Sequence, residues 1–402
     1  MSKEKSPFTP GRPVPVDYFV GRINEVRHLE RVIKQASTGR NENVFLTGER
    51  GIGKSSLADF ICFLAQKDFA FVGAHCYLGA ARNLEEICQL ILRELVRQLP
   101  DRSLTNKVQT ALSKYIEKID FDLFGIGVGV ELTRDAHKLE DIRLNFPDVI
   151  RSLYQTIGDE KKGIVLVLDD LDGVTTRVLE FAWFLKSFVD SLTEERRAFP
   201  LIILLVGIEV RMQDLALVQP SVPRIFERIE LPLMTDRESS QFFTQAFESV
   251  NCKLEQEALD LLVYYSGGLP TLMHEVGDAT FWLDEDNNID LDDALEGVLQ
   301  AADEVGRKYL TIKIYSAVRS SSYLSILRHI GGKLKKEFRR TEVLKEIPQA
   351  EKGKFDNFVG KMCSLGVIEH GRERGVYVFP NNLYRLYVYL EAKRAEEGKT
   401  KK

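Results

Sequence analysis

Residues 44–57, VFLTGERGIGKSSL, constrain the fold of this chain more than any other stretch. The run begins with apolar residues typical of a short strand, and Gly48, Gly53, Lys54 and Ser55 then fit the pattern G-x-x-x-x-G-K-[ST]. Glycines let a loop wrap around an anion, and the first N–H groups of a helix bind phosphate. The stretch therefore predicts a strand, a phosphate-binding loop and a helix within an α/β nucleotide-binding domain.

This loop predicts a site for ATP and Mg²⁺. Lys54 is expected to reach the β- and γ-phosphates and so to take part in catalysis, and the Ser55 hydroxyl is expected to ligate Mg²⁺. The residues expected to line the nucleotide are Gly48, Glu49, Arg50, Gly51, Ile52, Gly53, Lys54, Ser55 and Ser56.

Residues 163–172, GIVLVLDDLD, are the second motif of such a site. The continuous aliphatic run indicates a parallel strand buried on both faces, and ligands bind where such strands end. At that end, Asp169 is expected to hold Mg²⁺ through water, and Asp170 is expected to orient or deprotonate the attacking water. The alternative is that both carboxylates only cap the next helix.

The charge of the chain is divided between its two ends. The 402 residues carry a net charge of −5, but from residue 301 onward 22 Lys and Arg stand against 12 Asp and Glu, a net charge of +10. The length and a hydrophobic content of 44% predict two or three packed domains. The charge predicts that any nucleic-acid surface lies at the C-terminal end.

Cysteine usage and hydropathy indicate the compartment. The five cysteines are an odd number without a C-x-x-C pair, which favours buried thiols over disulfides or a metal site. The N-terminus lacks the apolar core of a signal peptide, and the longest aliphatic run, residues 201–208, is too short to span a bilayer. We expect a soluble, cytoplasmic protein without membrane contact.

The basic C-terminal region has the pattern of a winged helix-turn-helix. Three helical segments are followed by a hairpin at residues 366–379, and the third helix has apolar residues at i, i+3, i+4 and i+7. The outer face of that helix and the hairpin tip are expected to contact duplex DNA through Lys354, Asn357, Lys361, Arg372 and Arg374. Because such domains also dock proteins, a protein partner remains an alternative.

A further motif precedes the phosphate loop. Phe19, Val20, Gly21 and Arg22, with Glu25, match h-h-G-R-x-x-E. Together these motifs make the chain resemble AAA+ and STAND P-loop ATPases, including archaeal and bacterial initiator-like ATPases with a C-terminal winged helix. The resemblance implies that residues 19–22 bind the adenine.

The same resemblance implies an arginine that reaches the γ-phosphate of a neighbouring copy. Homo-oligomers would then form when ATP is bound. Arg224 is the first candidate for this catalytic arginine and Arg228 the second, and a surface or core-capping role for either is the alternative.

Two features, Asp170 and the turn at residues 268–270, place the chain nearer to the STAND branch, and the γ-phosphate sensor is not assigned. Most AAA+ enzymes have Glu where Asp170 stands, whereas STAND ATPases often have Asp, which implies slow hydrolysis. The turn Gly268-Leu269-Pro270 matches the Gly-x-Pro of STAND proteins, so Pro270 is expected at the nucleotide. Neither Glu209 nor Arg211 is the Asn, Thr or Ser expected of a γ-phosphate sensor.

The expected architecture is an AAA+-type core of five parallel strands, a helical lid and a winged helix. The expected parts are a flexible tail (1–16), the core (17–233) with an insertion (101–146), the lid (234–305), a linker (306–320), the winged helix-turn-helix (321–395) and a basic tail (396–402). Within the insertion, residues 121–132 alternate glycine with aliphatic residues, which predicts a surface strand or a functional loop.

The expected function is an ATP-hydrolysing switch whose nucleotide state controls oligomerisation and DNA engagement. The alternative is a STAND-type signalling or defence scaffold whose winged helix binds protein.

Overall fold

The computed structural model describes residues 3–99, 107–108, 111, 145–158, 160–193, 199–311, 314 and 320–400. The chain forms two compact units, Pro13–Pro232 and Met1–Arg12 with Leu233–Lys402. Most of the expected insertion at 101–146, including all of 121–132, lies outside the described residues. None of the described helices has the length and apolar character needed to cross a membrane.

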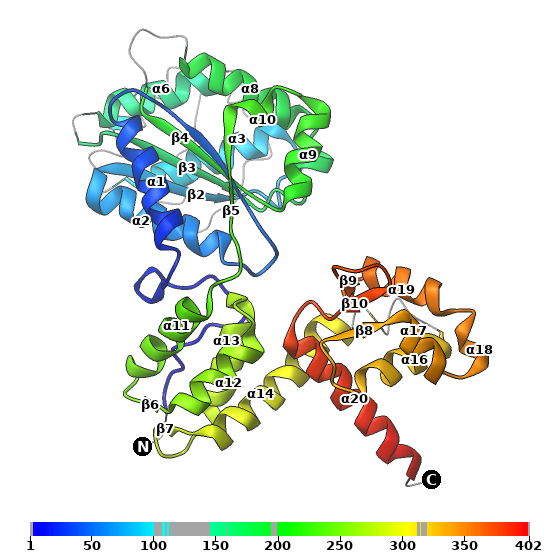
Figure 1. Cartoon of the computed structure of the whole chain (residues 1–402). Coiled ribbons are helices and arrows are strands. Elements are labelled where there is room, and N and C mark those ends of the chain that lie inside the picture. Colours follow the sequence, from blue (N-terminus) through cyan, green and yellow to red (C-terminus); the bar gives the residue numbers. More distant parts are fainter. Residues whose placement is uncertain are drawn as a thin grey trace. The chain divides into compact units, whose positions relative to one another are not determined.

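A five-stranded parallel sheet forms the middle of the first unit (Figure 1). Its order is β2-β3-β4-β1-β5. All residues of β3 and β4 are buried, as their aliphatic sequences predict for central parallel strands. The prediction of five parallel strands is confirmed. The strands are β1 (Asn43–Thr47), β2 (Phe71–Tyr77), β3 (Gly163–Asp169), β4 (Leu201–Val206) and β5 (Phe226–Glu230).

Helices cover both faces of this sheet (Figure 1). The helices α1 and α2 lie on one face, and the hydrophobic core on the other face joins alternate residues of β2 and β3 to α3, α6 and α8. The helices of this unit are α1 (Ile23–Ala36), α2 (Lys54–Phe69), α3 (Leu84–Arg97), α6 (Phe146–Ile157), α7 (Val174–Arg177), α8 (Glu180–Thr193), α9 (Glu209–Val218) and α10 (Val222–Ile225).

The second unit contains a bundle of four helices over the residues for which the sequence predicts a lid, and we call this bundle the lid. Thr235 and Glu238 form a capping box at the start of the first helix, and Asp290 and Asp293 form another at the start of the last. The helices are α11 (Asp236–Glu248), α12 (Gln256–Ser266), α13 (Pro270–Leu283) and α14 (Leu291–Val305), with a short parallel pair of strands β6 (Lys253–Leu254) and β7 (Asn288–Ile289).

Within the expected tail, residues 1–16, the described residues 3–12 belong to the same unit as the lid, and residues 13–16 belong to the first unit. Phe8 is 3% exposed and contacts the rings of Phe242, Phe243 and Phe247. Its ring fills the space beside Gly277 on α13, where a Cβ would lie 2.3 Å from it. A single aromatic residue in a polar stretch thus anchors the segment, because it finds a cluster of phenylalanines on α11.

The C-terminal part of the second unit is a winged helix-turn-helix. Three helices pack with the antiparallel sheet β8-β10-β9 around a core of buried aromatic and aliphatic residues. Its elements are α16 (Ser321–Gly331), β8 (Glu337–Arg339), α17 (Arg340–Glu346), α18 (Gln349–Lys352), α19 (Phe355–Ser364), β9 (Glu369–His370), β10 (Val376–Val378) and α20 (Asn382–Thr400).

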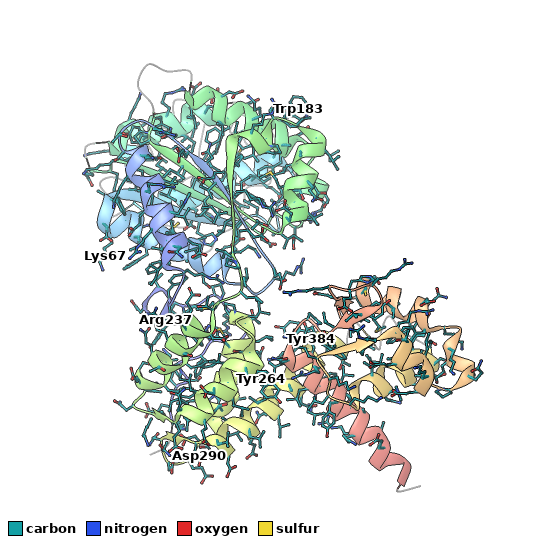
Figure 2. The ribbon with its side chains drawn as sticks, in the orientation of Figure 1. Lys67, Trp183, Arg237, Tyr264, Asp290 and Tyr384 are labelled. Atoms are coloured by element: carbon teal, nitrogen blue, oxygen red, sulfur yellow. The ribbon has the colours of Figure 1, made fainter. Side chains whose placement is uncertain are left out.

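Helix α20 connects the winged helix to the lid. Its Arg394 forms an ion pair with Asp303 of α14 at 2.6 Å, and its Arg385 donates a hydrogen bond of 3.0 Å to the Tyr264 hydroxyl of α12. Figure 2 labels Tyr264. The expected linker at 306–320 begins as a π-helix, Gly306–Thr311, that continues α14. The expected basic tail at 396–402 is helical up to Thr400.

Truncation of Phe8 tests whether the N-terminal segment stabilises the lid. Replacing a buried Phe with Ala costs about 3–5 kcal/mol, so Phe8→Ala is expected to lower the free energy of unfolding of the second unit by that amount. Phe8→Leu keeps most of the apolar volume and is expected to cost less. Chemical denaturation measures both, and equal stability of the wild type and Phe8→Ala would contradict the packing.

The buried His274 predicts a pH dependence of stability. Burial lowers its pKa from the ordinary value of 6.5 to about 4, and its Nδ1 accepts a hydrogen bond from Thr9 N–H. Because the unfolded chain then binds more protons between pH 4 and 6.5, the free energy of unfolding should fall by up to about 3 kcal/mol as the pH falls through that range.

The variant His274→Asn isolates this effect. Asn retains an acceptor for Thr9 but does not titrate, so its free energy of unfolding should depend less on pH between 4 and 6.5 than that of the wild type. Identical pH profiles of the two proteins would contradict the assignment.

Candidate functional site: a nucleotide-binding centre

The phosphate loop joins the carboxyl end of β1 to the N-terminus of α2. Gly53 immediately precedes α2 and has φ = 93°, a left-handed conformation that favours glycine. Lys54 and Ser55 are therefore the first helical residues, where N–H groups have no partner within the helix. The Lys54 ammonium donates to the carbonyls of Gly48 and Glu49 at 2.9 and 2.8 Å. The loop thus has the conformation that the motif predicts.

The two predicted acidic residues end β3 at the same edge of the sheet. Asp169 is 5% exposed, and one of its oxygens accepts a hydrogen bond of 2.6 Å from the backbone N–H of Asp170. Asp170 has φ = 58°, in the left-handed region that Asp tolerates better than most residues. Burial, with the charges of Asp169 and Asp172, raises the pKa of the Asp170 carboxyl.

Strand β4 lies between β1 and β3. The phosphate loop follows β1 and the two carboxylates stand at the end of β3, so both lie at the carboxyl end of the sheet, separated by one strand. The pKa of Lys54 also shows that the carboxylates are close to it. Burial lowers the pKa of the Lys54 ammonium, and the carboxylates of Asp169 and Asp172 oppose that shift. The structure therefore brings together the predicted lysine, the predicted serine at the helix start and the predicted aspartates.

A histidine bridges two carboxylates beside Asp169. The imidazole of His75, on β2, lies 2.9 Å from Asp169 through Nε2 and 2.5 Å from Asp59 of α2 through Nδ1. Its side chain is 7% exposed and stacks on Tyr77 with ring centroids 4.4 Å apart. Burial disfavours the imidazolium, but the hydrogen bonds with Asp169 and Asp59 outweigh it and raise the pKa of His75 to about 9.

An acidic residue in the loop after β3 holds two arginines. The Asp172 carboxylate pairs with Arg50 of the phosphate loop, and its other oxygen lies 3.3 Å from Nε of Arg211. Arg211 is on α9, directly after β4, and also pairs with Asp214 at 2.7 Å. These contacts tie the phosphate loop to the ends of β3 and β4.

The predicted adenine segment packs near the loop. Phe19 stacks on Phe60 of α2 with centroids 4.5 Å apart. The guanidinium of Arg22 is buried and donates to the carbonyls of Ile52 and Pro232, at 3.0 and 2.6 Å. Arg22 therefore holds the backbone of the phosphate loop. Val20 and Gly21 connect these two residues, and Gly21 has φ = 77°.

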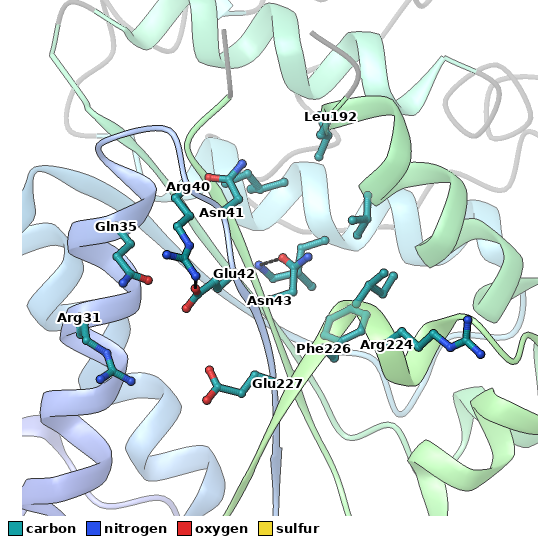
Figure 3. A pocket seen from close by; sticks show the side chains of 14 residues that line it. Arg31, Gln35, Arg40, Asn41, Glu42, Asn43, Leu192, Arg224, Phe226 and Glu227 are labelled. Carbon is teal, nitrogen blue, oxygen red and sulfur yellow. Dashed lines mark hydrogen bonds and ion pairs between the residues drawn. The ribbon is translucent and has the colours of Figure 1, made fainter. Parts of the chain in front are cut away.

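The two candidate interface arginines differ in their partners. Arg228 forms ion pairs with Glu209 at 3.1 Å and Glu230 at 2.9 Å, whereas the Arg224 side chain has no hydrogen bond or ion pair with any described residue. Arg224 lines a cavity of about 700 Å³ together with residues that begin β1, β4 and β5 (Figure 3). Arg224 thus lies at the end of the sheet where the strands begin, opposite the phosphate loop of its own chain.

The other predicted site residues lie in the second unit. Pro270 is the first residue of α13 and stands at a favourable position for helix initiation. On the winged helix, Asn357 and Lys361 are exposed on α19. Lys354 immediately precedes that helix, and its ammonium donates a hydrogen bond of 2.9 Å to the Ser322 hydroxyl. Arg372 and Arg374 are exposed between β9 and β10.

The residues at the sheet edge fit ATP with Mg²⁺. The start of the 16-residue helix α2 offers N–H groups and a helix dipole to phosphate, with a lysine beside them. The Ser55 hydroxyl and the Asp169 carboxylate are the hard oxygen donors that Mg²⁺ prefers, and this ion also keeps phosphate and water ligands. These oxygen donors would therefore suit a nucleotide-bound Mg²⁺.

Comparisons with known proteins agree with this geometry. Residues 18–203 match the model of a family described as AAA ATPase domain. An uncharacterized HTH-type transcriptional regulator of Methanocaldococcus jannaschii is 23% identical over 289 residues, which cover 67% of this chain and 66% of that protein. The chain thus spans slightly less than two thirds of the length of that relative.

Two solved structures have a similar fold. The ORC2 protein of Aeropyrum pernix, in ADPNP-ADP complexes, superimposes with a TM-score of 0.58 and 16% identity, covering 97% of this chain and 99% of that one. A Walker-type ATPase of Pyrococcus abyssi gives a TM-score of 0.54 and 19% identity, covering 92% and 96%. These structures confirm the prediction of an AAA+-type fold, and the match of residues 18–203 to an AAA ATPase domain supports the prediction of an ATPase.

Sequence reasoning missed several residues of this site. His75 is a polar residue in an otherwise apolar strand, and such a residue in a buried strand needs a partner. That signal could identify His75 but not its partners, because Asp59 and Asp169 come from other elements, α2 and β3. The pairing of Asp172 with Arg50 and Arg211 left no sequence signal for the same reason.

The lack of space between Gly79 and the Asp170 carboxylate allows a test of the role of Asp170. A Cβ on Gly79 would lie 1.8 Å from Oδ2 of Asp170, so Gly79→Ala must displace that carboxylate. We expect this variant to bind ADP like the wild type and to hydrolyse ATP at least tenfold more slowly, because general-base catalysis contributes about 10²–10⁴-fold.

A matched control is Gly207→Ala at the end of β4, where a Cβ would make ordinary contacts at 3.4 Å or more. Steady-state hydrolysis and fluorescent-ADP titration measure the two variants. Unchanged hydrolysis by Gly79→Ala would show that the Asp170 position does not limit the reaction.

Proposed function

We propose that this protein is an ATP-driven switch whose nucleotide state controls oligomerisation and DNA engagement through the C-terminal winged helix. The observation that supports it most is the combination in one chain of an AAA ATPase domain, with its phosphate loop and acidic strand end, and a lid fixed to a winged helix by α20.

The roles of the site residues follow from their chemistry. Lys54 and the N–H groups at the start of α2 bind and orient the phosphates. Ser55, and Asp169 through water, would hold Mg²⁺, which would supply positive charge beside the phosphates. Asp170 accepts a proton from the attacking water, and its raised pKa suits a general base because the best base has a pKa nearer the working pH.

Several features support DNA as the ligand of the winged helix. Lys361, Arg372 and Arg374 are exposed, and their side chains form no ion pair with any described residue. They belong to the third helix and the wing tip, the two elements that contact the major groove and the backbone in such domains. The net charge of +10 from residue 301 onward favours a phosphate backbone.

The switch needs a connection between nucleotide and DNA. The chain passes between its two units at residues 12–13 and again at 232–233, so the lid is joined twice to the ATPase domain. Lid and winged helix are in turn connected by α20. A lid that responds to nucleotide, with Pro270 at the phosphates as proposed, would therefore carry the winged helix with it.

Oligomerisation is proposed to depend on Arg224. This arginine lies at the sheet edge opposite its own phosphate loop, so the γ-phosphate that it can reach is that of another copy. An arginine supplied in this way stabilises transition-state charge.

The second candidate function is a signalling scaffold whose winged helix binds protein. The turn Gly268-Leu269-Pro270, which presents no charged side chain at the start of α13, favours it. So does the pairing of several basic residues: Arg340 with Asp356, Arg339 with Glu373, and Lys333 with Glu346.

Hydrolysis measurements test the proposal. Wild type, Lys54→Ala and Asp170→Asn are compared with and without duplex DNA, with particle size recorded in parallel. We expect Lys54→Ala to lose nucleotide binding, Asp170→Asn to bind ATP but hydrolyse it at least 10²-fold more slowly, and wild-type hydrolysis to change with DNA.

Two further outcomes distinguish the alternatives. Lys361→Ala with Arg372→Ala should remove the DNA effect but leave basal hydrolysis unchanged, whereas Lys393→Ala is a control outside the proposed contacts. ATP-dependent assembly that DNA does not affect would favour the signalling scaffold. Failure of the wild type to bind ATP would overturn both.

A further inference from the structure

The bridge Asp59–His75–Asp169 has no role in the function proposed so far. The two carboxylates lie on opposite ring nitrogens of His75, so the three side chains do not converge on a point where they could share an ion. The described residues contain no group of three or more His, Cys, Asp or Glu that could hold a metal. Any role of the bridge must therefore come from the effect of His75 on the two carboxylates that it contacts.

Each end of the bridge leads to a residue expected to hold Mg²⁺. Asp169 is one of them and contacts the imidazole directly, at 2.9 Å. Asp59 follows Ser55 by four residues on α2, so the two side chains lie on the same helix face one turn apart. His75 thus connects the strand end that carries Asp169 with the first turns of the helix that carries Ser55.

The geometry of the bridge leaves Asp169 little freedom. One of its oxygens is bound by the Asp170 N–H at 2.6 Å and the other by the imidazole. The imidazole is itself fixed by Asp59 at 2.5 Å and by stacking on Tyr77, and it is almost wholly buried. Each carboxylate oxygen retains a lone pair that can face a metal-bound water.

We propose that His75 is a positioning residue for Mg²⁺: it sets the distance and orientation between the Asp169 carboxylate and the helix turn that carries Ser55. This inference rests on the proposed ATP–Mg²⁺ site. Residues that orient metal ligands by hydrogen bonds change metal affinity by about 10–100-fold when they are replaced.

Titration with the fluorescent nucleotide mant-ADP tests the proposal without measuring hydrolysis. The affinity of the full chain is measured in Mg²⁺ and in EDTA, and their ratio reports the contribution of the metal. In His75→Ala, this ratio should fall by about 10–100-fold relative to the wild type, whereas the affinity in EDTA should stay within about twofold.

Further variants separate positioning from a general structural role. Asp59→Ala should also lower the ratio of the affinities in Mg²⁺ and in EDTA. His75→Gln, whose amide can donate to one carboxylate, should have a higher ratio than His75→Ala. His28→Ala is the matched control, because His28 also bonds to a carboxylate in this unit, Glu227, but lies on α1. If His75→Ala does not fold, Asp59→Ala and His75→Gln decide the question.

Two results would overturn the inference. One is an unchanged ratio in a folded His75 variant, and the other is an equal loss of affinity in Mg²⁺ and EDTA, which a purely structural role predicts. Failure of the proposed function is recognised separately: the wild type would then not bind mant-ADP at all, or Lys54→Ala would bind it equally well. That failure would remove this inference too.

Discussion

The parallel pairing of β4 with both β1 and β3 is the constraint on which the nucleotide site depends. Parallel strands end at a common edge, and β1 carries the phosphate loop there while β3 carries Asp169 and Asp170. Strands β3 and β4 are mostly aliphatic and buried throughout, so a shift in their alignment would expose apolar surface. Hydrophobic burial thus fixes the positions of the charged groups at the edge.

The sheet places the residues of the site approximately, and polar contacts between them then fix their positions more closely. Arg22 holds the phosphate loop from its backbone side, Asp172 connects Arg50 to Arg211, and His75 connects Asp59 to Asp169. Each contact joins residues of different elements, and the contacts of Arg22 and His75 give partners to buried polar side chains that would be costly to leave alone. A site built in this way can respond to a charged ligand, because a nucleotide competes for the same charged groups.

The sequence predicted the elements of the site better than the contacts between them. The phosphate loop, the acidic strand end, the five strands and the three helices with a wing all follow from local patterns, whose residues are neighbours in the chain. The role of Phe8 did not, because one aromatic residue in a polar segment carries no periodicity, and its partners lie more than 230 residues away. The bridge through His75 was missed because its partners belong to other elements, Asp59 to α2 and Asp169 to β3, and the local pattern of β2 does not indicate them.

The most direct test of the central claim is the affinity of the full chain for duplex DNA in the presence of ADP and of a non-hydrolysable ATP analogue, at fixed salt. Coupling between two sites typically changes affinity by about 5–150-fold, and we expect a difference in that range for the wild type and none for Lys54→Ala. Equal DNA affinity of the wild type with both nucleotides would contradict a nucleotide-controlled DNA switch.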